Sequence, residues 1–174
     1  MIKNFSANII LKMRFFTTLI LLITILIFLT HAPLTNAQQN IDLPQITIYP
    51  GMTYYPVKRL GEKIFEKFQF TSESKEKYYE ELVKKRMAEL KYVVDKDLLD
   101  QIEKSSQRLS YQIGILTDYV TSQKMDNKKG KIIEMYNQYK ILLEQLRDQY
   151  PANTSFWMLV QHVINSIDIN LQKL

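Results

Sequence analysis

The chain has 174 residues, a length that allows one compact domain beside an N-terminal segment. It contains no cysteine, which excludes disulfide frameworks, cysteine-ligated metal sites, thiol nucleophiles and an acylated lipoprotein cysteine. Of its 23 basic and 18 acidic residues, three basic and no acidic residues fall within residues 1–37, so the remainder carries 20 against 18, or +2. This near balance differs from the basic surface of a nucleic-acid-binding protein, and we expect no nucleic-acid partner.

Residues 1–37 have the organisation of an export signal. Three basic residues come first, namely Lys3, Lys12 and Arg14. A strongly apolar run, Phe15–Leu29, follows them, and Thr35 and Ala37 supply a small-residue exit. This pattern favours a signal peptide that is cleaved after Ala37. The alternative is an uncleaved membrane anchor over residues 15–30, although these 16 residues are short against the ~20 that span a bilayer. Both interpretations predict an extracytoplasmic domain, secreted, periplasmic or at the cell surface.

Residues 38–53 are predicted to form a linker or extended arm, because they contain Pro44, Pro50 and Gly51. Ile46, Ile48 and Tyr49 could form a short strand-like piece that lies on the domain. The composition then changes: residues 57–150 contain no proline and only three glycines. Such a stretch, rich in Glu, Lys, Leu and Gln, favours helices, so residues 54–174 are predicted to be a helical domain.

Apolar residues recur at three- and four-residue steps through this domain and predict helices at about 56–69, 72–94, 96–122, 128–149 and from about 154. Thr71 or Ser72 is the expected cap of the second helix. The first helix is expected to bury an apolar face made of Leu60, Ile64, Phe65 and Phe68. Narrow stripes and short connections predict an all-α fold, an antiparallel bundle or packed hairpins of about five helices. The stripes of the third and fifth helices also suit coiled-coil-like packing.

The search for reactive groups is mostly negative. His162 is the only histidine after residue 37, and no His-Glu-x-x-His, Gly-x-Ser-x-Gly or phosphate-binding glycine loop occurs. Glu80 and Glu81 lie among lysines and are predicted to be solvated helix surface. We therefore expect that the protein is not an enzyme and that it has no catalytic residues, no cofactor and no metal site.

One block of the sequence resembles a known bacterial family. Its residues are Tyr55-Pro56-Val57-Lys58-Arg59, Glu62, Phe68-Gln69-Phe70-Thr71 and Arg86-Met87-Ala88-Glu89-Leu90. They resemble the family catalogued as domain of unknown function 5667, over about residues 44–94, although Ser72-Glu73-Ser74 stands where the family often has Asp-Pro. The resemblance implies a helical domain of exported or membrane-anchored proteins and carries no known activity.

The same block is predicted to be a helical hairpin. An aromatic corner is expected, with Phe65, Phe68 and Phe70 packed against Tyr78, Tyr79 and Leu82. The candidate site residues are Tyr55, Pro56, Lys58, Arg59, Glu62, Phe70, Arg86 and Glu89. Their polar members are interpreted as an interhelical polar lock, in preference to a surface that recognises a partner. Arg86 is predicted to pair with Glu62 across an offset of ~9 Å along the helix axis, with Arg59 and Glu89 as the rival pair.

We expect a noncatalytic extracytoplasmic module that binds a protein partner at the cell envelope. This expectation rests on the export signal, the predicted bundle and the lack of a catalytic motif in the sequence. Membrane contact is expected only through residues 15–30, if these are retained. The alternative is a small periplasmic-type chaperone or stress sensor, which needs an exposed, concave apolar face. The oligomeric state stays open.

Overall fold

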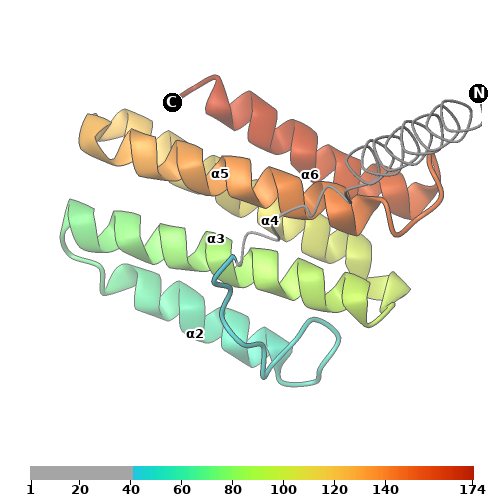
Figure 1. The fold of residues 1–174 in the computed structure, drawn as a ribbon. Helices are drawn as coiled ribbons and strands as arrows, with labels where there is room; N and C mark the ends of the chain where they lie inside the picture. The colour runs from blue at the N-terminus through green and yellow to red at the C-terminus, as the bar shows by residue number, and fades with distance from the viewer. Residues whose placement is uncertain (1–40) are drawn as a thin grey trace, which may run out of the picture. The chain divides into compact units, whose positions relative to one another are not determined.

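The computed structural model describes residues 41–174, so the predicted signal or anchor in residues 1–37 lies outside the described residues. Within them every regular element is an α-helix, which confirms the predicted all-α fold (Figure 1). The helix boundaries lie within three residues of the predicted ones. The helices are α2 (Tyr55–Lys67), α3 (Ser72–Asp95), α4 (Leu99–Ser122), α5 (Asp126–Arg147) and α6 (Ser155–Leu171).

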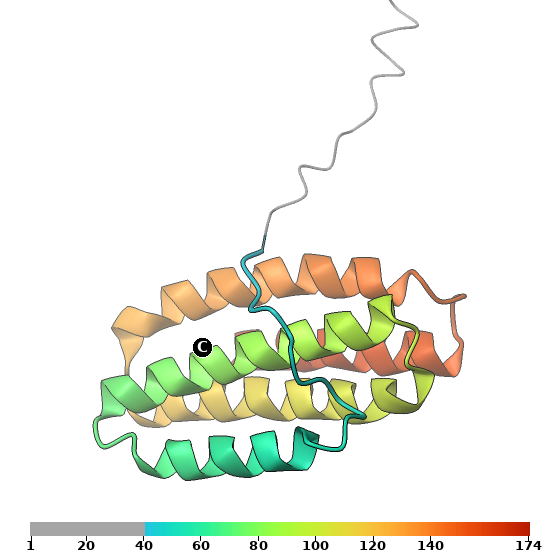
Figure 2. The same ribbon diagram turned by 90° about the horizontal axis from the view of Figure 1, so that it is seen from below.

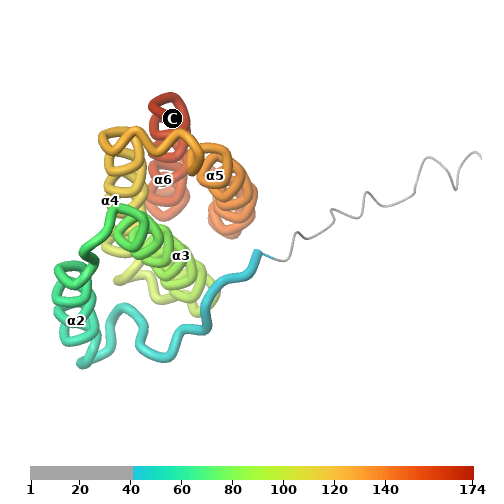
Figure 3. The backbone as a smooth tube through the Cα atoms, turned by 90° about the vertical axis from the view of Figure 1, so that its left-hand side faces the viewer, coloured from blue at the N-terminus to red at the C-terminus, as the bar shows by residue number. Residues whose placement is uncertain are grey.

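Helices α3 to α6 form a four-helix bundle. Short loops join consecutive helices, so these run antiparallel (Figure 2). Helix α6 lies between α4 and α5, and α3 packs against α4 (Figure 3). All four helices contribute to one apolar core, whose most deeply buried members include Val83, Leu90, Leu109, Ile113, Leu116, Tyr136, Leu143, Val163 and Ile167. Burial of such a side chain contributes roughly 1.5–3 kcal/mol, so this core is the main source of the fold's stability.

Local signals set the helix boundaries. Thr71 caps α3: its hydroxyl accepts a hydrogen bond from the Ser74 amide, and the Ser74 hydroxyl accepts one from the Thr71 amide, which together form a capping box. The Thr154 hydroxyl caps α6 by accepting a hydrogen bond from the amide of Trp157. Asp97 and Lys124, with φ of 52° and 53°, turn the chain after α3 and α4. The predicted cap at Thr71 is therefore confirmed.

The arm that precedes α2 follows the surface of the bundle. Ile41 and Leu43 pack against the apolar core, and the ring of Tyr49 stacks on Tyr92 with 4.7 Å between centroids. The predicted strand-like piece is absent from the described part of the arm, because no neighbouring strand offers its backbone a partner. Gly51 adopts a φ of 101°, which a residue with a side chain rarely adopts, and so allows the turn into α2.

Helix α2 lies outside the bundle, alongside α3 (Figure 3). Only Tyr55 and Glu62 of its residues are buried. Its predicted apolar face is turned the other way: Leu60, Ile64, Phe65 and Phe68 are all exposed, with Phe65 64% exposed. The prediction that this face is buried is wrong.

The predicted aromatic corner is wrong for the same reason. Phe70 is 86% exposed, and Phe65 and Phe68 point away from the core to which Tyr79 and Leu82 belong. Phe68 and Phe70 meet each other edge to face at 6.4 Å between centroids.

Across residues 41–174, no helix combines the length and the apolar character that crossing a membrane requires.

Candidate functional site

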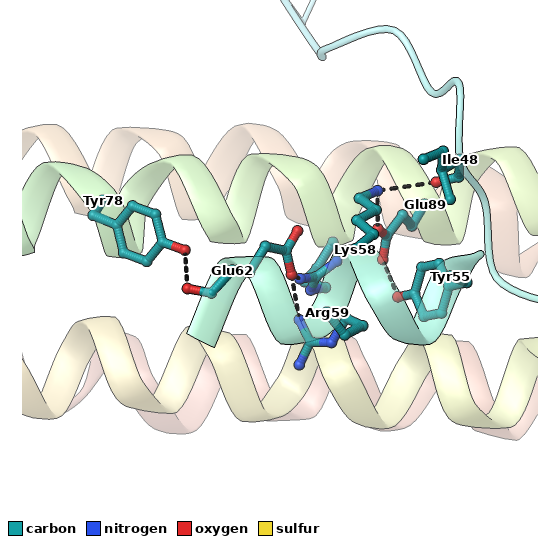
Figure 4. A network of polar contacts seen from close by, with 8 residues as sticks. Ile48, Tyr55, Lys58, Arg59, Glu62, Tyr78 and Glu89 are labelled. Atoms are coloured by element: carbon teal, nitrogen blue, oxygen red, sulfur yellow. Dashed lines mark hydrogen bonds and ion pairs between the residues drawn. The ribbon is translucent and has the colours of Figure 1, made fainter. Parts of the chain in front are cut away.

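A buried polar network joins α2 to α3. At its centre is Glu89 of α3, whose carboxylate accepts three hydrogen bonds. The Tyr55 hydroxyl donates at 2.7 Å, Lys58 Nζ at 2.7 Å and Arg86 Nη1 at 2.6 Å. Figure 4 shows Tyr55 and Lys58 of α2 converging on this carboxylate. Glu89 is thus held by two donors from α2 and one from its own helix.

Arg86 links this carboxylate to a second one. Its other terminal nitrogen donates to Glu62 of α2, and Arg59 Nη1 donates to the same Glu62 oxygen at 2.9 Å. The predicted pair between Arg86 and Glu62 is therefore confirmed. The rival pair is not formed: Arg59 contacts Glu62 on its own helix, while Glu89 is occupied by Lys58, Arg86 and Tyr55.

The direction of helical side chains explains how Arg86 and Glu62 meet despite their offset. Side chains on a helix lean toward its N-terminus. Because the α2–α3 turn follows the C-terminus of α2 and precedes the N-terminus of α3, Glu62 leans away from the turn and Arg86 leans toward it. The two side chains therefore approach each other along the axis, and their length closes the predicted gap.

Burial and charge act in opposite directions on these groups. Burial alone would raise the pKa of the Glu89 carboxyl, but the Arg86 charge and the hydrogen bonds of Lys58 and Tyr55 hold that pKa below its ordinary value. Burial would lower the pKa of Arg86, yet Glu89 and Glu62 raise it. Burial, followed by the neighbouring Glu89 charge, raises the pKa of the Tyr55 hydroxyl. Each of these three shifts favours the charged forms of Glu89 and Arg86 and the neutral form of Tyr55.

Further contacts add the arm, Tyr78 of α3 and Arg108 of α4 to this network. Lys58 Nζ also donates to the carbonyl of Ile48 in the arm at 2.9 Å, and the Tyr78 hydroxyl donates to the Glu62 carbonyl at 2.6 Å (Figure 4). The guanidinium of Arg108 in α4 lies 4.9 Å from the centroid of the Tyr55 ring. Sequence reasoning missed Tyr78 and Arg108 as members. A buried hydroxyl needs a hydrogen-bond partner, so Tyr78 could have been considered, whereas no sequence signal indicates Arg108.

The network also explains why the apolar face of α2 is turned outward. The side of α3 that faces α2 carries Arg86 and Glu89, because the apolar stripe of α3 faces α4 and α5. Apolar side chains placed there would leave these charges buried and unpaired, which costs far more than exposing apolar side chains. The polar side of α2 supplies the matching groups.

We call the resulting exposed surface the α2 outer face. It consists of Tyr54, Val57, Leu60, Ile64, Phe65, Phe68 and Phe70, all exposed. Both carboxylates of α2 lie on the opposite side: Glu62 binds Arg86, and Glu66 accepts a hydrogen bond from the Tyr79 hydroxyl at 2.6 Å. Contiguous exposed apolar surface of this kind marks interaction sites. Of the remaining candidate residues, Pro56 is exposed in the first turn of α2, and Phe70 belongs to the outer face.

A second group of buried carboxylates lies nearer the N-terminus of α3 and corrects one prediction. Glu80 is buried rather than solvated, and it accepts from Lys84 at 2.9 Å and from Lys131 of α5 at 2.6 Å. Burial alone would raise the pKa of the Glu80 carboxyl, but these two lysines outweigh that effect and hold the pKa below its ordinary value. Lys128 pairs with the buried Glu76 at 3.3 Å. These ion pairs tie α5 to α3.

Both groups consist of carboxylates paired with basic or tyrosine side chains. No cluster of histidine, aspartate or glutamate within residues 41–174 has the geometry to hold a metal ion. His162 is exposed on α6. What the described residues assemble is an all-α domain in which a four-helix bundle holds a flanking helix by charged and polar side chains.

Comparison with known families identifies the family of the chain. The chain belongs to the family described as Domain of unknown function (DUF5667), which matches residues 47–153. The match extends beyond the 44–94 of the resemblance and includes all of α2 to α5. No curated protein and no solved structure matched the chain.

Proposed function

We propose that this protein is a noncatalytic, extracytoplasmic docking module that binds a component of the cell envelope through the α2 outer face. The observation that carries the proposal is the orientation of α2, which directs its polar side to the bundle and its apolar side outward. The export-type pattern of residues 1–37 supports the location.

The polar network supports this function by holding the outer face in place. Helix α2 is fixed by Arg86 and Glu89 and is continuous with an arm bound through Lys58. A helix held in one orientation loses little conformational freedom when it docks, so more of the contact energy contributes to affinity. The chaperone alternative needs a concave apolar face, whereas the outer face lies along a single helix on the outside of the bundle (Figure 3).

Photo-crosslinking in the native cells tests the proposal. A photoreactive amino acid is placed at Ile64 in the outer face and, as a matched control, at Ile141 in α5, since their exposed fractions are 49% and 50%. We expect an adduct at Ile64 that is absent at Ile141. No adduct at Ile64, or the same adducts at both positions, would contradict docking through α2. Suppression of client aggregation at stoichiometric amounts would instead favour the chaperone.

A further inference from the structure

We propose that the component bound by the α2 outer face is the interfacial region of an anionic lipid bilayer, an inference that rests on the proposed function. Helix α2 would lie in the plane of the membrane surface with its outer face among the upper acyl chains, while the bundle stays on the water side. This contact is additional to any made by residues 15–30.

The side chains of the outer face match such an interface in kind. Interfacial helices combine a strong apolar side with phenylalanine and leucine and a charged opposite side. The outer face contains three phenylalanines, Phe65, Phe68 and Phe70, beside Leu60 and Ile64. These three rings are 64%, 60% and 86% exposed, so most of their apolar surface is open for burial by a partner.

The charges that α2 itself places beside the outer face are positive. Lys63 and Lys67 follow Leu60 at three and seven positions, so they line one edge of the outer face. Both are exposed, and neither forms an ion pair within residues 41–174. Because Glu62 and Glu66 are turned to the bundle, no carboxylate of α2 accompanies the apolar side chains. Apolar side chains of α2 that are bordered by its lysines are complementary to acyl chains beneath anionic headgroups.

The same charges disfavour a second copy of the chain as the occupant. In an antiparallel pairing of two α2 helices about a twofold axis, the edge with Lys63 and Lys67 meets the same edge of the partner helix. In a parallel pairing that edge meets the opposite one, where Lys58 is already paired with Glu89 and α2 offers no carboxylate. Neither arrangement supplies α2 with a negative charge for these lysines, whereas an anionic bilayer does.

Fluorescence depth measurement on the full chain tests the inference. Because the chain has no cysteine, the variants Ile64→Cys and Ile141→Cys each carry a single attachment site for an environment-sensitive dye. The labelled proteins are reconstituted in vesicles of phosphatidylcholine alone or with phosphatidylglycerol, with a nitroxide quencher on the lipid acyl chain. We expect blue-shifted emission and nitroxide quenching at position 64 in vesicles with phosphatidylglycerol, and neither at position 141. Replacing Lys63 or Lys67 with glutamine should lower the docked-to-undocked ratio about fivefold each.

Equal quenching at positions 64 and 141 would overturn the inference. A blue shift at position 64 that rises with protein concentration and lacks nitroxide quenching would identify a second copy instead. If the label is not quenched while the cellular crosslink at Ile64 captures a protein, the docking function stands and the lipid assignment fails. If the cellular crosslink gives no adduct at Ile64, the docking function itself fails. An unchanged circular dichroism spectrum for each variant confirms that the exposed substitution leaves the fold intact.

Discussion

Replacing Arg86 with methionine removes the charge that links the two carboxylates of the network and keeps most of the unbranched side chain. Arg86 is 1% exposed and donates to both Glu62 and Glu89. Removing one member of a fully buried ion pair costs about 3–5 kcal/mol. Glu89 retains Lys58 and Tyr55, and Glu62 retains Arg59, so neither carboxylate is left without a donor. We therefore expect the lower end of that range, about 3 kcal/mol.

Urea unfolding followed by far-ultraviolet circular dichroism measures this loss in the free energy of unfolding. Arg59→Met is the matched control, since it removes a partly exposed ion pair within one helix and should cost less than about 1 kcal/mol. A double-mutant cycle of Arg86→Met with Glu62→Gln should give a coupling of about 1–3 kcal/mol. A loss for Arg86→Met no larger than that of Arg59→Met, or a coupling of zero, would refute the reasoning that this pair fixes α2 on the bundle.

Three further predictions concern the helix cap, pH and processing. Thr71→Ala removes the capping box of α3 and should lower the free energy of unfolding by about 1 kcal/mol in the same urea assay; no change would contradict the cap. Because the folded-state pKa of Glu89 lies below its ordinary 4.5, its stabilisation is present above that pH and is lost as pH falls further. Thermal unfolding should therefore show a smaller loss of Tm on acidification for Glu89→Gln than for the wild type; parallel curves would refute this role. N-terminal sequencing of the exported protein should begin at Gln38, whereas intact Met1 in washed membranes would establish the anchored alternative.

The sequence predicts the bundle well because its signals are local. Three- and four-residue apolar steps, the Thr71 cap and the proline-free span act within a few turns of chain. The same reasoning predicts the pair of Arg86 and Glu62, since a short turn places two helices antiparallel. These features can be predicted without knowing how the rest of the chain packs.

The orientation of α2 could not be predicted in this way. An amphipathic pattern indicates which side of a helix is apolar, and it predicts burial only when an apolar surface remains to receive that side. Here the apolar stripe of α3 is already covered by other helices, and its remaining side presents Arg86 and Glu89. The burial of Glu80 could not be predicted for a related reason: its partner Lys131 comes from α5, 51 residues away. Both errors concern long-range pairing of charges.

The rate at which a thiol at position 64 reacts tests the orientation of α2 most directly. The full chain is labelled in aqueous buffer as the single-cysteine variants Ile64→Cys, Ile141→Cys and Val83→Cys, the last at a fully buried core position. An outward apolar face predicts that the thiol at position 64 reacts about as fast as that at position 141 and far faster than that at position 83. A thiol at position 64 as protected as that at position 83 would contradict the outward orientation and, with it, docking through α2.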